Sequence, residues 1–188
     1  MSRLPHSFYT RDARLVGRDL LGQVLVTVAG GVRTSGIITE TEAYLGQDDL
    51  ASHSYRGPTD RNRSMFLPGG HAYVYFIYGM YYCFNVVTGL EGIGEAVLVR
   101  GVEPLEGIET MRKRRKRQLR RPADLADGPG KLAIALGIGP ELNGADLATD
   151  PRVWIERGED IPERMVLATP RIGITKSVEH PWRWVRRA

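Results

Sequence analysis

The sequence predicts an α+β fold, in which a mostly antiparallel sheet with a protruding hairpin is flanked by helices. Short segments of strand-forming residues are joined by glycine turns, and helical spacing of apolar residues occurs elsewhere along the chain. With 188 residues, 42% of them hydrophobic, the chain can close one core and is short for two. We therefore expect residues 1–188 to form a single domain.

The N-terminal part predicts a helix followed by a hairpin. Apolar residues at helical spacing favour a helix over 10–22, with Thr10 as its cap and a glycine at its end. Residues 23–28 and 33–42 are typical of strands. The glycines in the turn at 29–31 join these strands into a hairpin.

The middle of the chain predicts a long loop and a meander. Residues 45–68 are too polar for a core and too long for a simple connection, and loops of this kind often carry function. Three strands are expected over 72–77, 81–87 and 96–101. Residues 78–80 form the tip of the first hairpin.

The C-terminal part predicts two helices and several short strands. Proline opens a first turn well and basic residues suit the last turns, so a helix is expected from Pro104. A turn at 128–130 precedes a second helix that begins near Lys131. Short strands are expected between 153 and 184.

Charge and cysteine content narrow the classes of function. The formal net charge of +4 favours an anionic partner such as nucleic acid or an anionic membrane surface. The single cysteine, Cys83, cannot form an intrachain disulfide, and no zinc-binding spacing is present. The N-terminus lacks the apolar core of a signal peptide and no stretch resembles a membrane span. We expect a cytoplasmic, nucleoid-associated protein that does not bind membranes.

Two carboxylates lie on one face of a predicted strand. Glu40 and Glu42 are two residues apart, so their side chains share a face that Tyr44 continues, and His53 follows in the polar loop. Such a pair can simply point to solvent. A carboxylate beside aromatic rings, however, is partly desolvated and can serve as a general base.

The segment 71–85 is unusually rich in aromatic residues. Sheet packing alone can explain this density, yet aromatic faces also stack on nucleobases and attract cationic bases most strongly. Tyr78 and Met80 stand at the expected hairpin tip, where a ring could serve as a wedge between base pairs.

Basic residues concentrate between 111 and 121. This run, which includes Arg114 and Arg115, can be a solvated helix face or a contact for phosphates. The turn at 128–130 followed by Lys131 offers a further anion site at a helix start. Both are weak signals when taken alone.

The order of these motifs resembles that of the 3-methyladenine (alkyladenine) DNA glycosylase family. The similarity extends from about Arg14 to Trp184, nearly the whole chain, and several motifs in unchanged order are more specific than any one of them. The motifs are Glu40–Tyr44, Ala51–Ser54, Thr59–Asn62 with Met65 and Phe66, Tyr73–Met80, Val97–Arg100 with Glu103–Gly107, Gly128–Leu132 and Arg171–Gly173.

The resemblance implies roles for the matching positions. Glu42 matches the general base and Arg100 the residue that helps to hold the attacking water. The pocket that stacks around a flipped base is matched by Tyr44, His53 and Tyr75. A filter against normal guanine is matched by Asn85. The side chain that fills the gap in the duplex is matched by Tyr78, with Met80 beside it.

The family resemblance also implies the chemistry. A base hidden in a duplex must be extruded before its glycosidic bond can be reached. Glu42 would then activate water and stabilise the oxocarbenium-like sugar, leaving an abasic site in an intact strand. We expect a monomer that acts on double-stranded DNA containing damaged purines, needs no cofactor or metal, and performs no lyase step.

Two alternatives come from other functional classes. A metal-dependent nuclease would use a set of hard ligands and would lose its activity in EDTA. Its ligands would be Glu40, Glu42, Asp48, Asp49 and His53. A non-catalytic nucleic-acid-binding module would keep its function after Glu42 is removed.

Overall fold

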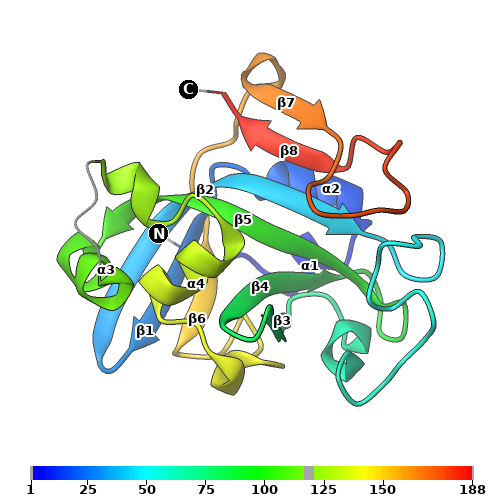
Figure 1. Ribbon diagram of the computed structural model, residues 1–188, viewed down its shortest axis with the longest axis horizontal. Coiled ribbons are helices and arrows are strands. Elements are labelled where there is room, and N and C mark those ends of the chain that lie inside the picture. The colour runs from blue at the N-terminus through cyan, green and yellow to red at the C-terminus, as the bar shows by residue number, and fades with distance from the viewer. Residues whose placement is uncertain (1, 117–120, 188) are drawn as a thin grey trace.

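The computed structural model describes residues 2–116 and 121–187. Its centre is a curled antiparallel sheet with the strand order β3-β4-β5-β2-β1-β6, and β7 and β8 form a small extension on β2 (Figure 1). The strands are β1 (Val24–Ala29), β2 (Val32–Tyr44), β3 (Ala72–Ile77), β4 (Tyr81–Thr88), β5 (Glu95–Glu106), β6 (Val153–Glu156), β7 (Val166–Thr169) and β8 (Arg183–Arg186). This antiparallel sheet with helices confirms the α+β class.

Helices cover the sheet from both sides. The α-helices are α1 (His6–Tyr9), α2 (Ala13–Asp19), α3 (Ile108–Arg115) and α4 (Pro129–Leu136). Short 3-10 turns occur at Arg63–Phe66, Pro122–Leu125, Pro140–Leu142 and Glu163–Met165. In Figure 1, α4 lies in front of β4 and β5, while α2 packs behind β2 and β5. None of the helices within 2–116 and 121–187 is long and apolar enough to cross a membrane.

Strand β2 is the organising element because it borders three other strands. Its first half pairs with β1, its length pairs with β5, and its end pairs with β8 over Glu40–Glu42. A strand paired on both edges cannot shift its register without moving its buried face to solvent. The end of β2 is therefore a rigid platform for side chains.

The N-terminal hairpin was predicted correctly, but the cap of the first long helix was not. Gly30 and Gly31 both have positive φ (63° and 74°), as a two-residue hairpin turn requires. The side chain of Asp12, rather than that of Thr10, caps α2 by accepting a hydrogen bond from the Arg14 amide. Thr10 instead follows the separate short helix α1.

The helix predicted from Pro104 is wrong at its start. Strand β5 continues through Pro104, and α3 begins only at Ile108, after Gly107 in a left-handed conformation. Proline is tolerated here because it lies opposite Gly36, where the pairing with β2 is irregular. The second helix begins at Pro129, two residues earlier than predicted.

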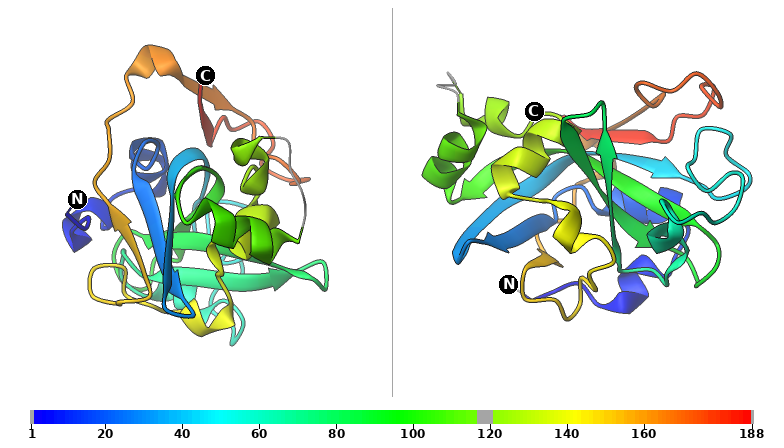
Figure 2. Two further views of the ribbon diagram at one scale, coloured as in Figure 1. Left: turned by 90° about the vertical axis from the view of Figure 1, so that its left-hand side faces the viewer. Right: turned by 60° about the horizontal axis from the view of Figure 1, so that its bottom comes forward.

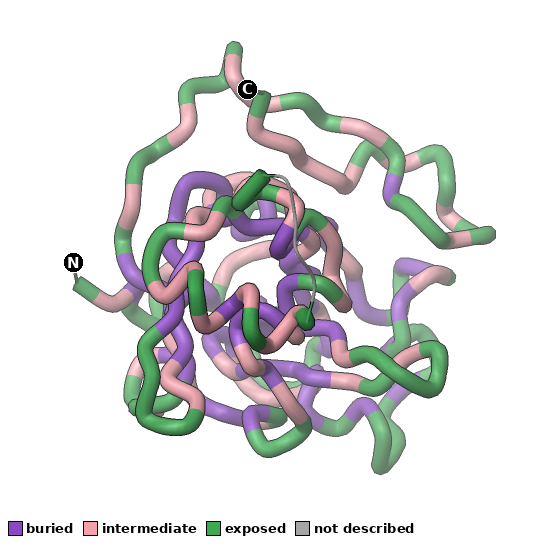
Figure 3. The backbone as a smooth tube through the Cα atoms, turned by 60° about the vertical axis from the view of Figure 1, so that its left-hand side comes forward, coloured by how far each residue is buried: buried purple, intermediate pink, exposed green. Residues whose placement is uncertain are grey.

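The aromatic hairpin lies at one edge of the sheet, and the C-terminal strands extend it on the other side of β5, next to β2. Strands β3 and β4 form the predicted hairpin, which rises away from the body of the molecule (Figure 2). The predicted loop 45–68 contains only one short 3-10 turn. Residues 157–187 run along the outside of the molecule and are mostly exposed or half-buried (Figure 3).

Candidate active site

Glu42 lies at the centre of a closed polar network on β2. Its side chain is completely buried, yet both carboxylate oxygens have donors. Oε2 accepts from the Tyr44 hydroxyl at 2.9 Å and from Nη1 of Arg100 at 3.3 Å. Oε1 accepts from the backbone amide of Ile172 at 2.7 Å. A buried carboxylate held in this way keeps a fixed orientation.

Arg100 on β5 links the two carboxylates of the predicted pair. Its Nε donates to Glu40 at 2.8 Å, and Arg183 on β8 donates to the same Glu40 oxygen at 2.6 Å. Burial alone would lower the pKa of Arg100, but the negative charges of Glu42 and Glu40 raise it above its usual value. Arg100 is therefore a permanent cation at the site.

An aromatic pocket of about 700 Å³ lies directly beside this network. Tyr44 from β2, His53 from the loop and Tyr75 from β3 all line it, so the structure brings the predicted stacking residues together. The rings of His53 and Tyr75 meet edge to face with their centroids 4.6 Å apart. Glu42 is fully buried and does not line the cavity, whereas its three hydrogen-bond partners, Tyr44, Arg100 and Ile172, all do.

Burial sets the ionisation of the pocket side chains. It lowers the pKa of His53, and the charge of Arg61 lowers it further, so the imidazole is neutral at neutral pH. Burial is also the main cause that raises the pKa of Tyr44, followed by the negative charge of Glu42. The hydroxyl of Tyr44 therefore stays protonated and serves as a donor.

The histidine is fixed by a neighbour that sequence reasoning did not single out. Nδ1 of His53 lies 3.0 Å from the hydroxyl of Tyr73, whose ring stacks on that of Tyr75. Burial raises the pKa of Tyr73 to about 12, so this hydroxyl stays protonated. Alternation along β3 could have indicated that residues 73 and 75 share a face.

Asn85 and the hairpin tip occupy different parts of the pocket wall. Asn85 on β4 is buried, lines the cavity and donates through Nδ2 to the backbone oxygen of Tyr73 at 3.0 Å. Tyr78 and Met80 are 79% and 63% exposed at the tip of the β3–β4 hairpin. Tyr78 also has a positive φ of 54°, which is uncommon for an aromatic residue.

The three predicted phosphate-binding residues have different surroundings. Arg115 and Lys131 line the rim of the pocket, and the Nε of Arg115 is buried without a hydrogen-bond partner among residues 2–116 and 121–187. Arg114 instead donates to the backbone oxygens of Ala29 and Ala135, at 3.0 and 3.1 Å. The placement of Arg114 therefore favours a structural role over the predicted phosphate contact. Residues 117–120 of the basic run lie outside the described residues.

The side chains that the nuclease alternative requires do not converge. Asp49 is paired with Arg171 and Glu40 with two arginines, while Asp48 is exposed. Across the described ranges, no group of three or more His, Cys, Asp or Glu side chains is arranged to hold a metal ion. The geometry does not support a metal-dependent nuclease.

Comparison with known proteins identifies the family of this chain. The family model described as "Methylpurine-DNA glycosylase (MPG)" matches residues 7–188. The chain belongs to this family. Its members are DNA glycosylases of DNA repair, so the protein is a hydrolase that acts on N-glycosyl bonds.

Individual relatives are similar over nearly their whole lengths. Three proteins, each named "Putative 3-methyladenine DNA glycosylase", come from Chlorobaculum parvum, Methanoculleus marisnigri and Myxococcus xanthus. Their identities to this glycosylase are 49%, 50% and 47%, respectively. The alignments cover 97%, 96% and 99% of this chain and 87%, 93% and 91% of the relatives.

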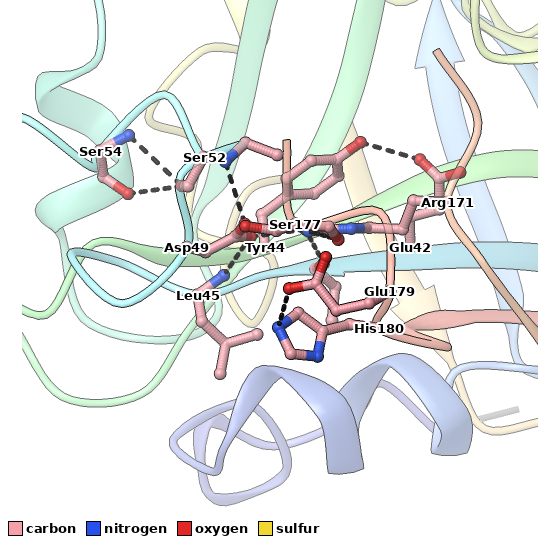
Figure 4. A network of polar contacts seen from close by, with 12 residues as sticks. Glu42, Tyr44, Leu45, Asp49, Ser52, Ser54, Arg171, Ser177, Glu179 and His180 are labelled. Carbon is pink, nitrogen blue, oxygen red and sulfur yellow. Dashed lines mark hydrogen bonds and ion pairs between the residues drawn. The ribbon is translucent and has the colours of Figure 1, made fainter. Parts of the chain in front are cut away.

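Besides Tyr73, two further groups in the site of this glycosylase were not predicted from the sequence. The first is the amide of Ile172, which binds Glu42; the second is the buried pair of Asp49 and Arg171 behind Tyr44 (Figure 4). Arg171 belongs to a family motif, but the motif alone does not indicate what its side chain contacts. A backbone donor has no residue-type signal at all.

Proposed function

We propose that this glycosylase flips alkylated or deaminated purines out of duplex DNA and hydrolyses their N-glycosidic bonds with water activated by Glu42. The observation that carries the proposal is a buried carboxylate whose three hydrogen-bond partners line an aromatic pocket. The volume of about 700 Å³ is within the range of small-molecule sites and accommodates a purine nucleotide. The surrounding rings provide stacking surfaces for the base.

The residues divide the work between binding and chemistry. Tyr44 on one side and His53 with Tyr75 on the other would stack on the flipped base, and their π faces favour a cationic alkylated purine. Glu42 would take a proton from water while Arg100 holds that water. Tyr44 and Arg100 both donate to Oε2 of Glu42, whereas among the described residues Oε1 accepts only from the Ile172 amide, so Oε1 keeps an acceptor site for the water.

The geometry favours a monofunctional enzyme. A lyase step requires a neutral lysine that attacks the sugar and forms a Schiff base. Lys131, which lines the pocket, is half exposed and forms an ion pair with Asp127 at 2.8 Å, so its side chain is engaged with that carboxylate. Water as the nucleophile leaves an intact strand with an abasic site.

Basic side chains beside the pocket, Arg115 and Lys131, would bind phosphates of the DNA. Arg115 has an unpartnered buried Nε among the described residues, and the chain before α4 turns at Gly128 beside Lys131. Backbone amides at a helix start and basic side chains together bind phosphates well. We place the phosphates next to the extruded nucleotide here.

The decisive experiment compares the protein with Glu42→Gln on duplexes that carry one alkylated or deaminated purine. In EDTA, the wild-type protein should release the base and leave alkali-labile sites without direct strand cleavage. Glu42→Gln keeps the shape but cannot accept a proton, so excision should fall at least about a hundredfold while binding survives. Loss of activity in EDTA would favour the nuclease, and normal turnover by the variant would assign the base elsewhere, first to Glu40.

A further inference from the structure

An arginine is the one buried residue in the outer C-terminal segment. Between 157 and 187, all other residues are exposed or half-buried (Figure 3). The side chain of Arg171, by contrast, is completely buried. Burial of a charge is costly unless it is paired and hydrogen-bonded. A segment that needed only an anchor could use an apolar residue, so the charge calls for an explanation.

The partner of Arg171 is Asp49, whose side chain is also completely buried. The pairing is bidentate: Nη1 and Nη2 each donate to one oxygen of Asp49, the latter at 2.9 Å. Asp49 also accepts from the backbone amides of Leu45 and Ala51, at 3.2 and 3.0 Å. The pair thus fixes the start of the loop 45–68 to the C-terminal segment, 122 residues away.

The same guanidinium supports the end of β2. Nη1 of Arg171 donates to the backbone oxygen of Ala43 at 2.9 Å, and the guanidinium carbon lies 4.6 Å from the centre of the Tyr44 ring. On another side, it lies 5.0 Å from the ring of Trp182. Contacts of this kind restrict the orientation of an aromatic ring. Figure 4 shows Arg171 between Glu42, Tyr44 and Asp49.

The residue after Arg171 contacts the carboxylate directly. The amide of Ile172 is the donor to Oε1 of Glu42, at 2.7 Å, and Tyr44 is a donor to Oε2. Because the Arg171 side chain and the amide of Ile172 are joined through one Cα, the position of the side chain restricts the direction of the Ile172 N–H. Arg171 of the ion pair therefore contacts one donor to Glu42, Tyr44, and is bonded to the residue that supplies another, Ile172.

We propose that the Asp49–Arg171 pair is a positioning device for the reaction, which aligns the Ile172 amide and the Tyr44 hydroxyl on Glu42. Neither charged side chain lines the pocket, so neither touches the base. This inference rests on the proposed role of Glu42 as the base. It predicts that damage to the pair slows hydrolysis more than it weakens DNA binding.

The test uses Arg171→Lys, which keeps the charge but removes the two-pronged geometry, and Asp49→Asn, which keeps the shape but removes the charge. Excision is measured in single turnover on a duplex with one hypoxanthine. Binding is measured on a duplex with a tetrahydrofuran abasic analogue. The rate of each variant should fall about tenfold or more, the scale of removing one hydrogen bond to a charged group, with affinity changed less than about twofold.

A matched control separates positioning from reduced stability. Ile155→Ala removes buried volume from β6, on the far side of β1 from the site, and should lower the Tm without changing the single-turnover rate below that Tm. Rates are compared at a temperature where every variant is folded. Rates for Arg171→Lys and Asp49→Asn that match this control, or equal decreases in rate and affinity, would overturn the proposal.

A second variant distinguishes this proposal from the assignment of the base. Glu42→Gln is run in the same assay. If Glu42→Gln is inactive while Arg171→Lys and Asp49→Asn turn over normally, the positioning role fails and the proposed function stands. If Glu42→Gln itself turns over normally, the proposed function fails, and the positioning role fails with it.

Discussion

At the scale of single residues, burial decides which functional groups are charged. His53 has a lowered pKa because it is buried, with a second contribution from Arg61. In the unfolded chain the imidazole titrates near its ordinary pKa of 6.5. Between that value and the folded pKa the unfolded state binds more protons, so stability falls as the pH is lowered through this window.

The electrostatic part of this shift can be tested with Arg61→Gln. Removing the nearby positive charge should raise the pKa of His53 toward its ordinary value, while burial keeps it below that value. Proton NMR titration of the His53 ring in both proteins measures the change. Arg63→Gln, in the same loop, is a control of equal charge. An unchanged or lower pKa in Arg61→Gln would contradict the assignment.

Asn85 is the second residue whose role can be tested by itself. Its buried amide, held by the backbone of Tyr73, would crowd the exocyclic amino group that guanine has and adenine lacks. Asn85→Ser should therefore increase the release of guanine from undamaged DNA by about fivefold or more, the scale of one unfavourable polar contact. The measurement is chromatography of the freed bases. Unchanged selectivity would show that Asn85 only ties β4 to β3.

At the scale of elements, the β3–β4 hairpin presents an aromatic ring to solvent. Tyr78 is 79% exposed in a left-handed backbone conformation, so its ring contributes little to the core. We propose that this ring fills the gap left by the flipped nucleotide, because unstacked pairs regain contact when an aromatic ring inserts between them.

Tyr78→Ala tests the hairpin tip. Affinity for a lesion-containing duplex should fall about tenfold, because unstacking costs a few kcal/mol that the ring no longer offsets in part. Fluorescence of 2-aminopurine next to the lesion should show a smaller flipped fraction, with the Tm nearly unchanged. Leu90→Ala, a similarly exposed side chain on the turn between β4 and β5, should alter neither readout. A large decrease in Tm with normal flipping would make Tyr78 structural and Met80 the nearest alternative.

At the scale of the whole molecule, some basic side chains bind carbonyl groups of the protein interior, and others line the pocket where DNA could reach them. Arg114 donates into the interior, whereas Arg115 and Lys131 stand at the pocket rim. Only cations that reach phosphates release counterions and steepen the salt dependence of binding.

The salt dependence of DNA binding distinguishes these groups. Replacing Arg115 and Lys131 with alanine should weaken binding to damaged and undamaged duplex alike. It should reduce the slope of log K against log salt by about one unit for each phosphate interaction that is removed. Lys113→Ala removes an exposed charge from α3 as the control, and Arg114→Ala should lower the Tm with little effect on the slope. Equal slopes for the double variant and Lys113→Ala would show that Arg115 and Lys131 do not contact phosphates.

Local sequence patterns were sufficient to predict the class of fold and to indicate several side chains that the structure brings together beside the pocket. Glycine pairs, proline positions and apolar alternation are local signals, so the N-terminal hairpin and the meander were predicted closely. The spacing of Glu40, Glu42 and Tyr44 on one strand was sufficient to place a carboxylate beside an aromatic ring. Family motifs then indicated which distant residues belong with it.

Local sequence patterns could not predict which charged side chains are buried. Pro104 continues a strand because Gly36 lies opposite it, and Arg114 turns inward because carbonyl groups of distant elements face it. Asp49 and Arg171 look like ordinary surface residues in the sequence, and they are 122 positions apart. Whether a charge is solvated or buried depends on what the rest of the chain packs around it, and that is decided by contacts between residues far apart in the sequence.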